Sequence, residues 1–329
     1  MKITNTLRSL RRRSCLLALF LLALGLVVGC QGRTDLAGTV ENCTPIEHAA
    51  GSSCVPKAFE RLVTLDGMSF EDAIASGLAP VATSFSGLVG HLEEHLVGVE
   101  NVGQAGEPNL ESVLALKPDL ILGLDHHQGI YGQAAQIAPT VLFASEHSGQ
   151  WKERFKRVGE ALGQAEAVEQ TMDAYYARLA DFKAQMGHLQ GLKVSVVRIY
   201  PDTINLYLRD SFCGTVLQDA GLSRPAAQDI GAEEAIARFD NPIQTSISQE
   251  LLDQADGDVI FLWTGENTAE AAETAQEKLQ TLQQDPLWQQ LKAVQQGRVY
   301  VVPSYWIGSG AVAANRVIDD LFTYLVTHS

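Results

Sequence analysis

QAEAVEQTMDAYYARLADFKAQMG, residues 164–187, is the stretch that decides the fold. Its apolar residues recur at steps of four, three, four, three and four, and they are Val168, Met172, Tyr175, Leu179, Phe182 and Met186. This spacing predicts a single apolar stripe along a helix. Because no proline or internal glycine interrupts the stretch before Gly187, we expect one continuous helix of about 36 Å.

Two copies of one pattern flank this predicted helix. Residues 109–122 read NLESVLALKPDLIL and residues 248–261 read SQELLDQADGDVIF, and the two align without a gap. Each copy has a helix-capping residue, a glutamate two places on (Glu111 and Glu250), a short helix, a proline or glycine break, an aspartate and a strand of the buried type. We therefore predict two similar lobes joined by one rigid helix.

The alternation of predicted strands and helices with short connections sets the fold class. It indicates parallel βα units, and so an α/β protein in which each lobe is a mostly parallel sheet flanked by helices. We place the N-terminal lobe at 59–163, the linker helix at 164–188 and the C-terminal lobe at 189–329. Since a continuous helix resists bending, we expect a cleft protein that closes on its ligand with small movements.

The N-terminus predicts export. Basic residues precede Cys15–Val28, an apolar run of 14 residues that is too short to span a bilayer comfortably. Val27-Val28-Gly29-Cys30 then resembles a bacterial lipoprotein cleavage box. We expect 1–29 to be a signal peptide and Cys30 to carry the lipid, which would hold the protein at the periplasmic face of the cytoplasmic membrane or at the cell surface. A simple secretory signal or a short anchor is the alternative.

Composition limits the partners of this chain. The 329 residues are 46% hydrophobic and 19% charged, as in ordinary globular proteins, and are enough for two lobes. Residues 1–29 hold five basic and no acidic side chains, so their removal leaves 19 Lys and Arg against 39 Asp and Glu, a net charge of −20. So acidic a surface excludes nucleic acid as a partner. We expect a monomer.

The cysteines suggest one disulfide. Cys43 and Cys54 lie eleven residues apart in a loop-like part of the N-terminal segment 30–58. In the oxidising setting that the export signal implies, this pair predicts a disulfide. Cys213 is left over, and we interpret it as a buried, inert thiol.

Two histidine patterns are candidates for metal binding. Residues 91–95 read HLEEH, which matches an inverted zinc-protease signature with His91 and His95 on one helical face. The segment is short and no third ligand follows it, so we disfavour a metalloprotease. His126 and His127 follow a predicted strand at its carboxyl end, where a metal site and a plain polar loop both remain open. No nucleophile, base and orienting group come together in the sequence, so we predict that the protein is not an enzyme and has no resident cofactor.

Arginine and aromatic residues near predicted strand ends are the best candidates for ligand binding. They are Arg198, Tyr200, Arg209, Trp263, Tyr305 and Trp306. Arginine offers paired donors to carboxylates, and aromatic rings cover flat apolar faces. The set suits a bulky ligand that is partly anionic and partly apolar.

From about Cys43 to the C-terminus the chain resembles the periplasmic iron-siderophore substrate-binding proteins, the single-helix-hinge class that also includes cobalamin- and haem-binding members. The segments that carry the resemblance are HAAGSSCVP, GEPNLESVLALKPDLILG, IYGQAAQIAPTV, GTVLQDAGLSRP, ISQELLDQADGDVIF, DPLWQQLKAVQQGRVYVV and SYWIGSGAVAANRVIDDL. The resemblance implies that the protein delivers a ferric chelate to an ABC importer, a permease dimer with its ATPase. It also implies that Glu111 and Glu250 engage permease arginines.

The family's pocket positions fall on the arginine and aromatic set above, with His126 added from the first lobe. Many members have an arginine where His126 stands, and another where this chain has Gln104-Ala105-Gly106. The first lobe is therefore poor in cations, which favours a hydroxamate-containing siderophore over a strongly anionic chelate. A haem or cobalamin binder of the same fold is one alternative. A metal binder or hydrolase that depends on His91, His95 or His126 is another.

Overall fold

The computed structural model describes residues 42–85, 90–104, 107–187, 191–266 and 268–327. The predicted signal peptide, the acceptor Cys30 and residues 31–41 of the N-terminal segment lie outside these residues. Residues 43–329 form one compact unit, which is described here by itself. Within the described part of the chain, no helix combines the length and the apolar character needed to cross a bilayer.

A β-hairpin opens this unit. Strands β1 (Cys43–His48) and β2 (Gly51–Pro56) pair antiparallel, and the predicted disulfide joins Cys43 to Cys54 across them. The expectation of a loop-like stretch was therefore wrong. The hairpin is fixed because it binds the edge strand β8 (Thr140–Phe143): the Ala49 N–H donates to the Leu142 carbonyl at 2.9 Å, and the Ser53 hydroxyl donates to the Thr140 carbonyl at 2.7 Å.

The first lobe contains a six-stranded sheet in the order β6-β5-β4-β3-β7-β8. Only the β5–β6 pair is antiparallel, so the sheet is mostly parallel, as predicted. Its further strands are β3 (Leu62–Thr64), β4 (Ala82–Phe85), β5 (Glu100–Gln104), β6 (Glu107–Pro108) and β7 (Leu120–Leu124). The helices of this lobe are α2 (Gly67–Ala75), α3 (Leu110–Ala115), α4 (Gln128–Ile137) and α5 (Trp151–Ala161).

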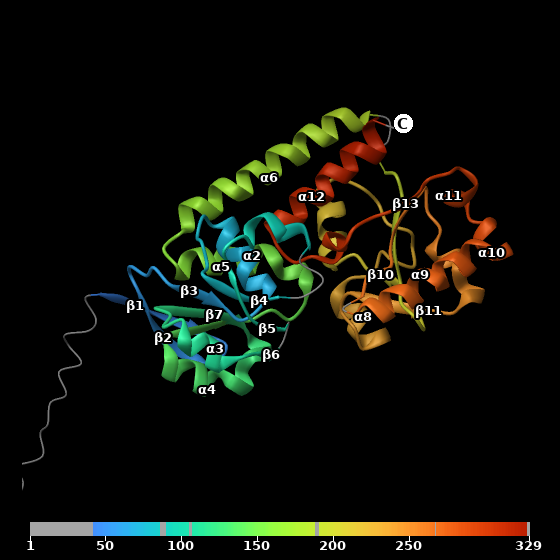
Figure 1. Cartoon of the computed structure of the whole chain (residues 1–329). Helices are drawn as coiled ribbons and strands as arrows, with labels where there is room; N and C mark the ends of the chain where they lie inside the picture. Colours follow the sequence, from blue (N-terminus) through green and yellow to red (C-terminus); the bar gives the residue numbers. More distant parts are fainter. Residues whose placement is uncertain (1–41, 86–89, 105–106, 188–190, 267, 328–329) are drawn as a thin grey trace, which may run out of the picture. The chain divides into compact units, whose positions relative to one another are not determined.

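The second lobe contains a five-stranded mixed sheet in the order β11-β10-β9-β12-β13 (Figure 1). Strands β9, β12 and β13 are parallel, while β10 runs antiparallel to β9 and β11. The strands are β9 (Val194–Ile199), β10 (Ile204–Tyr207), β11 (Gln244–Ile247), β12 (Val259–Trp263) and β13 (Val299–Val301). The helices are α7 (Phe212–Asp219), α8 (Ala232–Phe239), α9 (Ala269–Gln283), α10 (Pro286–Gln289), α11 (Lys292–Gln295) and α12 (Ala311–Leu321).

The two lobes repeat one local arrangement. Strand β7 lies between the parallel strands β3 and β8, and strand β12 lies between the parallel strands β9 and β13. The aspartate before each central strand accepts hydrogen bonds from backbone N–H groups that precede its neighbour: Asp119 from Glu60 and Arg61, both at 2.9 Å, and Asp258 from Lys193 at 2.8 Å. The duplicated sequence pattern therefore corresponds to a duplicated βα unit.

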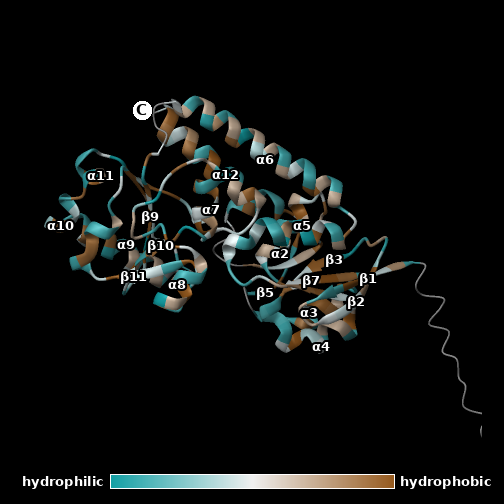
Figure 2. Cartoon of the chain, turned by 180° about the vertical axis from the view of Figure 1, so that it is seen from behind, coloured by the Kyte–Doolittle hydropathy of each residue, from teal (hydrophilic) through white to brown (hydrophobic). Residues whose placement is uncertain are grey.

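Helix α6 (Ala165–Met186) is continuous over 22 residues, as its sequence predicts. Five residues of its apolar stripe are buried and Met172 is partly buried, and together they pack in the largest core cluster of the chain. The helix contacts α5 in the first lobe and α12 in the second (Figure 1). Figure 2 shows mostly hydrophilic residues on the visible face of α6, so the helix buries one side only. At 1.5 Å per residue it extends over about 33 Å.

Candidate functional site

An arginine held between two aromatic rings lies at the carboxyl ends of two neighbouring strands. Arg198 is the penultimate residue of β9 and Trp263 is the last residue of β12, and the parallel register of these strands places the two side by side. The guanidinium carbon of Arg198 lies 4.0 Å from the ring centroid of Trp263 and 4.0 Å from that of Tyr200. Both rings are close enough for cation–π attraction. The structure therefore brings these three candidate residues together.

Arg198 is also engaged by polar groups. Its Nη2 donates to the Gly265 carbonyl at 3.1 Å and pairs with Oε2 of Glu266 at 3.2 Å, and its Nη1 donates to the Tyr207 hydroxyl at 3.4 Å. The residue is only 8% exposed. Its Nε and the Oε1 atom of Glu266 are buried and have no hydrogen-bond partner among the described residues. The charges of Arg198 and Glu266 therefore balance, and the pair leaves one donor and one acceptor without a partner.

Arg209, the second predicted arginine, is also paired with carboxylates. It lies after β10, half-buried, with Nη1 at 3.1 Å from Asp229 and Nε at 3.6 Å from Asp210. The polar partners found for it among the described residues differ from those of Arg198. Neither arginine therefore presents an uncompensated positive charge to a ligand.

Tyr305 and Trp306 lie on a short 3₁₀ turn, Ser304–Ile307, and share one partner. Both donate hydrogen bonds to Oδ2 of Asp320, at 2.9 Å from the Tyr305 hydroxyl and 2.7 Å from the Trp306 indole N–H. Trp306 is completely buried and stacks on Phe261 with ring centroids 4.2 Å apart, so its ring offers no accessible surface in this structure. Tyr305 is half-buried, and its ring lies 6.3 Å from that of His91.

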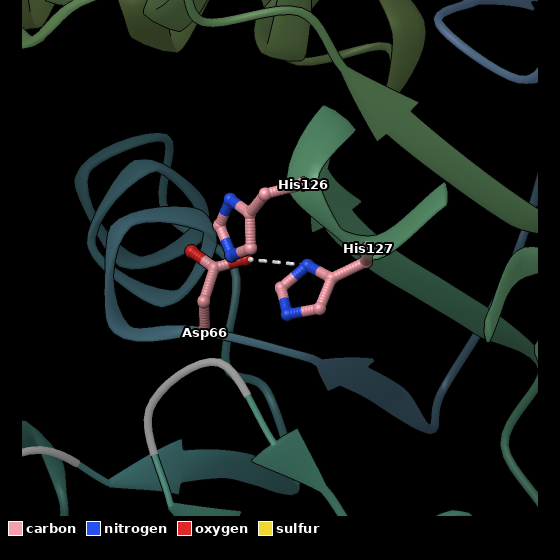
Figure 3. Close-up of side chains that lie close together, drawn as sticks. All are labelled: Asp66, His126 and His127. Atoms are coloured by element: carbon pink, nitrogen blue, oxygen red, sulfur yellow. Dashed lines mark ion pairs between the residues drawn. The ribbon is translucent and has the colours of Figure 1, made fainter. Parts of the chain in front are cut away.

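His126 and His127 follow β7 in a 3₁₀ turn, beside Asp66 at the start of α2 (Figure 3). His126 is exposed and His127 is 3% exposed, and the two ring centroids are 4.0 Å apart. The Nδ1 atom of His127 lies 3.7 Å from Oδ2 of Asp66. Potential ligand atoms of the three residues all lie within 4.8 Å of one another, which is the only such group found in the part of the chain that the structure describes.

Two residues of this group already accept hydrogen bonds within the fold. His127 Nδ1 accepts the Leu124 N–H at 3.3 Å, so the proton of its neutral ring sits on Nε2. Asp66 caps α2, accepting from the Ser69 N–H at 2.7 Å and from the Ser69 hydroxyl at 2.9 Å. Burial lowers the pKa of His127, which keeps the ring neutral. We therefore interpret Asp66 and His127 as contacts within the fold, and His126 stays a predicted ligand contact.

The H-x-x-E-H segment does not form a zinc site. Gly90–His95 is a 3₁₀ helix with about three residues per turn, so side chains four residues apart point in different directions. The expectation that His91 and His95 share one helical face was therefore wrong. His91 is turned inward, with Nε2 at 3.4 Å from Oε2 of Glu71, whereas His95 is exposed.

A buried polar network that we did not predict links the two lobes. Arg154 on α5 forms a bidentate ion pair with Asp72 on α2, at 2.6 and 3.2 Å, and also donates to the hydroxyl of Ser309, at 2.9 Å, and to its carbonyl. Glu71 on α2 accepts the Ala313 N–H of α12 at 2.8 Å. Burial raises the pKa of Asp72 to about 6, although Arg154 acts in the opposite direction.

The sequence did carry a signal for this network. Arg154 lies within the apolar periodicity of its helix, between Trp151 and Phe155 and four residues before Val158, and all three are buried. A charged residue at a core-facing helix position indicates a buried partner of opposite charge.

Glu111 and Glu250 occupy the same position in the two lobes. Each is exposed and is the second residue after its cap, Asn109 for α3 and Ser248 for the 3₁₀ segment Gln249–Ala255. A hydrogen bond from its own backbone N–H, together with one from Ser248, lowers the pKa of Glu250. Both side chains are exposed and are therefore accessible to a partner.

Several recesses lie away from these residues. They are lined by the β1–β2 hairpin and α5, by α5 and α6, and by the β8–α5 connection with Asp210. Their linings contain none of the predicted ligand contacts, so we assign them no part in the site.

Two α/β lobes joined by one continuous helix, with arginine and aromatic side chains at strand ends, define a solute-binding protein. The chain belongs to the periplasmic binding protein family, whose model matches residues 62–306. Members of this family bind substrates and are not enzymes, which settles the class of this chain.

Relatives agree with this assignment. The chain is 30% identical to a probable siderophore-binding lipoprotein of Bacillus subtilis, over 96% of this chain and 99% of that protein. It is 28% identical to the achromobactin-binding periplasmic protein of Dickeya dadantii, over 80% of this chain and 85% of that one. It also resembles the crystal structure of Staphylococcus aureus SirA complexed with staphyloferrin B, with a TM-score of 0.74 and 26% identity over 86% of this chain and 98% of that chain. The resemblance to siderophore-binding proteins is thus confirmed.

Proposed function

We propose that this chain is a lipid-anchored extracytoplasmic binding protein that captures a ferric siderophore and delivers it to an ABC importer. The observation that carries the proposal is Arg198 held between Tyr200 and Trp263 at the carboxyl ends of β9 and β12. Ligands of open α/β sheets bind at this edge. The iron stays inside its chelate, so the protein needs no metal ligands of its own, and none are proposed here.

We infer that the ligand is a weakly charged, hydroxamate-containing chelate. Arg198 and Arg209 are each matched by carboxylates, and the first lobe contributes the exposed imidazole of His126 instead of an arginine. A strongly anionic chelate would find no free cation at these positions. A chelate with neutral oxygens and apolar linkers instead fits rings that cover apolar surface and donors that bind single oxygens.

The predicted site residues take different roles in this proposal. Tyr200 and Tyr305, both half-buried, contact the apolar parts of the chelate, and Arg198 donates to its oxygens. Arg209 and His126 contact it from the edge of the site. Trp306 supports Tyr305 from the core, since the two share Asp320.

The anchor and the partner belong to the same proposal. Cys30 would carry the lipid and Glu111 and Glu250 would dock on the permease, one from each lobe. The lipoprotein relative, the cleavage box and the exposed, equivalent positions of the two glutamates support this.

The binding test uses the mature chain and its own tryptophans. Quenching of tryptophan fluorescence is titrated with ferrioxamine B, ferric enterobactin, ferric dicitrate, haem and cobalamin. We expect sub-micromolar affinity for the ferric hydroxamate, and a loss of about tenfold or more in Arg198→Leu because the donor and the cation–π platform are both removed.

Arg238→Leu is the matched control for this test. Arg238 also lies against a ring, 4.8 Å from that of Phe239, and pairs with Glu234 at 2.8 Å, but on the exposed face of α8. Its removal should leave the affinity unchanged. No response to any ferric chelate would contradict the proposal, and saturation by haem or cobalamin alone would assign the site to that ligand.

A further inference from the structure

We propose that Glu266 determines the specificity of this site, because its carboxylate occupies the place at Arg198 that a ligand carboxylate would take. The inference rests on the proposed function and adds to it a residue that excludes strongly anionic chelates. Glu266 belongs to the connection after β12, and none of the sequence patterns pointed to it.

The connection is built to bring Glu266 onto Arg198. Gly265 passes so close over the Trp263 ring that a Cβ at this position would lie 2.4 Å from a ring carbon. Its carbonyl accepts from Arg198 at 3.1 Å, and the Glu266 carboxylate follows at 3.2 Å. The side chains of Arg198 and Glu266 are only 10% and 13% exposed, so solvent screens the pair weakly.

The pair leaves two hydrogen-bonding groups unused, which indicates a site for a ligand. Arg198 Nε and Glu266 Oε1 are buried, and neither has a partner within the described residues. Buried polar groups in a purely structural ion pair are normally satisfied, because an unpaired one is unfavourable. Nε can donate to a neutral oxygen, and Oε1 can accept from an N–H or an ammonium group. The complementary ligand therefore carries amide or hydroxamate oxygens next to an N–H or amine.

A ligand with a negative charge is disfavoured at this site. A carboxylate that binds Arg198, either at the unused Nε or in the place of Glu266, lies close to a second negative charge in a largely buried site. Like charges at such a distance repel each other, and repulsion of the wrong ligand is a general means of specificity. A neutral hydroxamate oxygen leaves the Arg198–Glu266 pair intact.

The test is the affinity ratio between one hydroxamate and one anionic chelate. Wild type and Glu266→Gln, which keeps the shape and removes the charge, are titrated with ferrioxamine B and ferric dicitrate. We expect ferric dicitrate to bind about tenfold more tightly to the variant, while the affinity for ferrioxamine B stays equal or falls because its amine loses a carboxylate partner. Glu266→Asp keeps the charge and should keep the wild-type preference.

Glu273→Gln is the control for net charge. Glu273 is exposed on α9 of the same lobe, so this variant makes the same charge change outside the site. An equal shift in Glu273→Gln, or an unchanged ratio in Glu266→Gln with its wild-type circular dichroism and thermal midpoint, would overturn the inference and leave the proposed function standing. Failure of the wild type to bind any ferric chelate would instead refute the proposed function itself.

Discussion

At the scale of single residues, two buried arginines differ in how fully their guanidinium groups are hydrogen-bonded. Arg154 has a fully buried side chain, and its guanidinium is satisfied by Asp72 and by both the hydroxyl and the carbonyl of Ser309. Arg198 is almost as buried but keeps Nε without a partner in the described structure. We interpret the first as a structural contact between the lobes and the second as a contact kept for a ligand.

Removal of Arg154 tests its structural role. In Arg154→Met the Asp72 carboxylate remains buried without a cation, which should lower the free energy of unfolding by about 3–5 kcal/mol. The double variant Arg154→Met, Asp72→Leu removes both charges and should recover part of this loss. Urea unfolding followed by fluorescence measures both. Equal stabilities of wild type and Arg154→Met would show that the Arg154–Asp72 pair contributes nothing to the free energy of unfolding.

At the scale of elements, periodicity was a good guide wherever an element buries one face. The stripe of α6 and the two strands of the duplicated pattern, β7 and β12, lie where the sequence predicts them. Periodicity was a poor guide for short segments. Between 286 and 295, for example, the chain forms two short helices, α10 and α11, separated by an extended Leu291. The β1–β2 hairpin was expected to be loop-like, and no prediction was made for α8 and β11.

A pair of substitutions on α6 separates core packing from helix propensity. Leu179 is 2% exposed in the main core cluster, so Leu179→Ala should lower the free energy of unfolding by about 2–5 kcal/mol. Ala180 is its exposed neighbour, and Ala180→Gly should lower the free energy of unfolding by only about 1 kcal/mol. Denaturant unfolding compares the two. If the glycine variant were the less stable one, local helix propensity rather than packing would hold the linker.

At the scale of the whole molecule, the duplicated unit and the helix between the lobes explain how one chain presents two equivalent surfaces. The same βα unit places Glu111 and Glu250 two residues after a cap in each lobe. A permease dimer with two equivalent basic sites could bind both at once, which would raise the effective affinity of the pair above that of either contact. The interlobe contacts of Arg154 and Glu71 add a connection besides the linker helix.

Permease docking gives the prediction at this scale. Glu111→Ala combined with Glu250→Ala should abolish uptake of the ferric chelate and leave its affinity within about twofold, because both carboxylates are exposed and distinct from the proposed pocket. Iron-59 uptake in cells and fluorescence titration of the purified chain measure the two quantities. Glu60→Ala with Glu277→Ala, also one exposed glutamate in each lobe, is the control. A fall in affinity would place Glu111 or Glu250 in the pocket.

The sequence by itself determined the fold class, the duplicated halves, the linker helix and the Cys43–Cys54 disulfide. These follow from periodicity and from the spacing of residues near one another in the chain. It also pointed to Arg198, Tyr200 and Trp263 as one group, because strand ends in a parallel sheet meet at one edge.

Only the tertiary structure decided which charges are free. Glu266 and Arg198 are 68 residues apart, and Arg154 and Ser309 are 155 apart, so no local pattern reports either contact. Burial likewise turned Trp306 from a ligand contact into a core residue, and the 3₁₀ geometry at His91 separated two histidines that an α-helix would have aligned. Charge balance and burial depend on contacts between distant segments, and those contacts form only when the chain has folded.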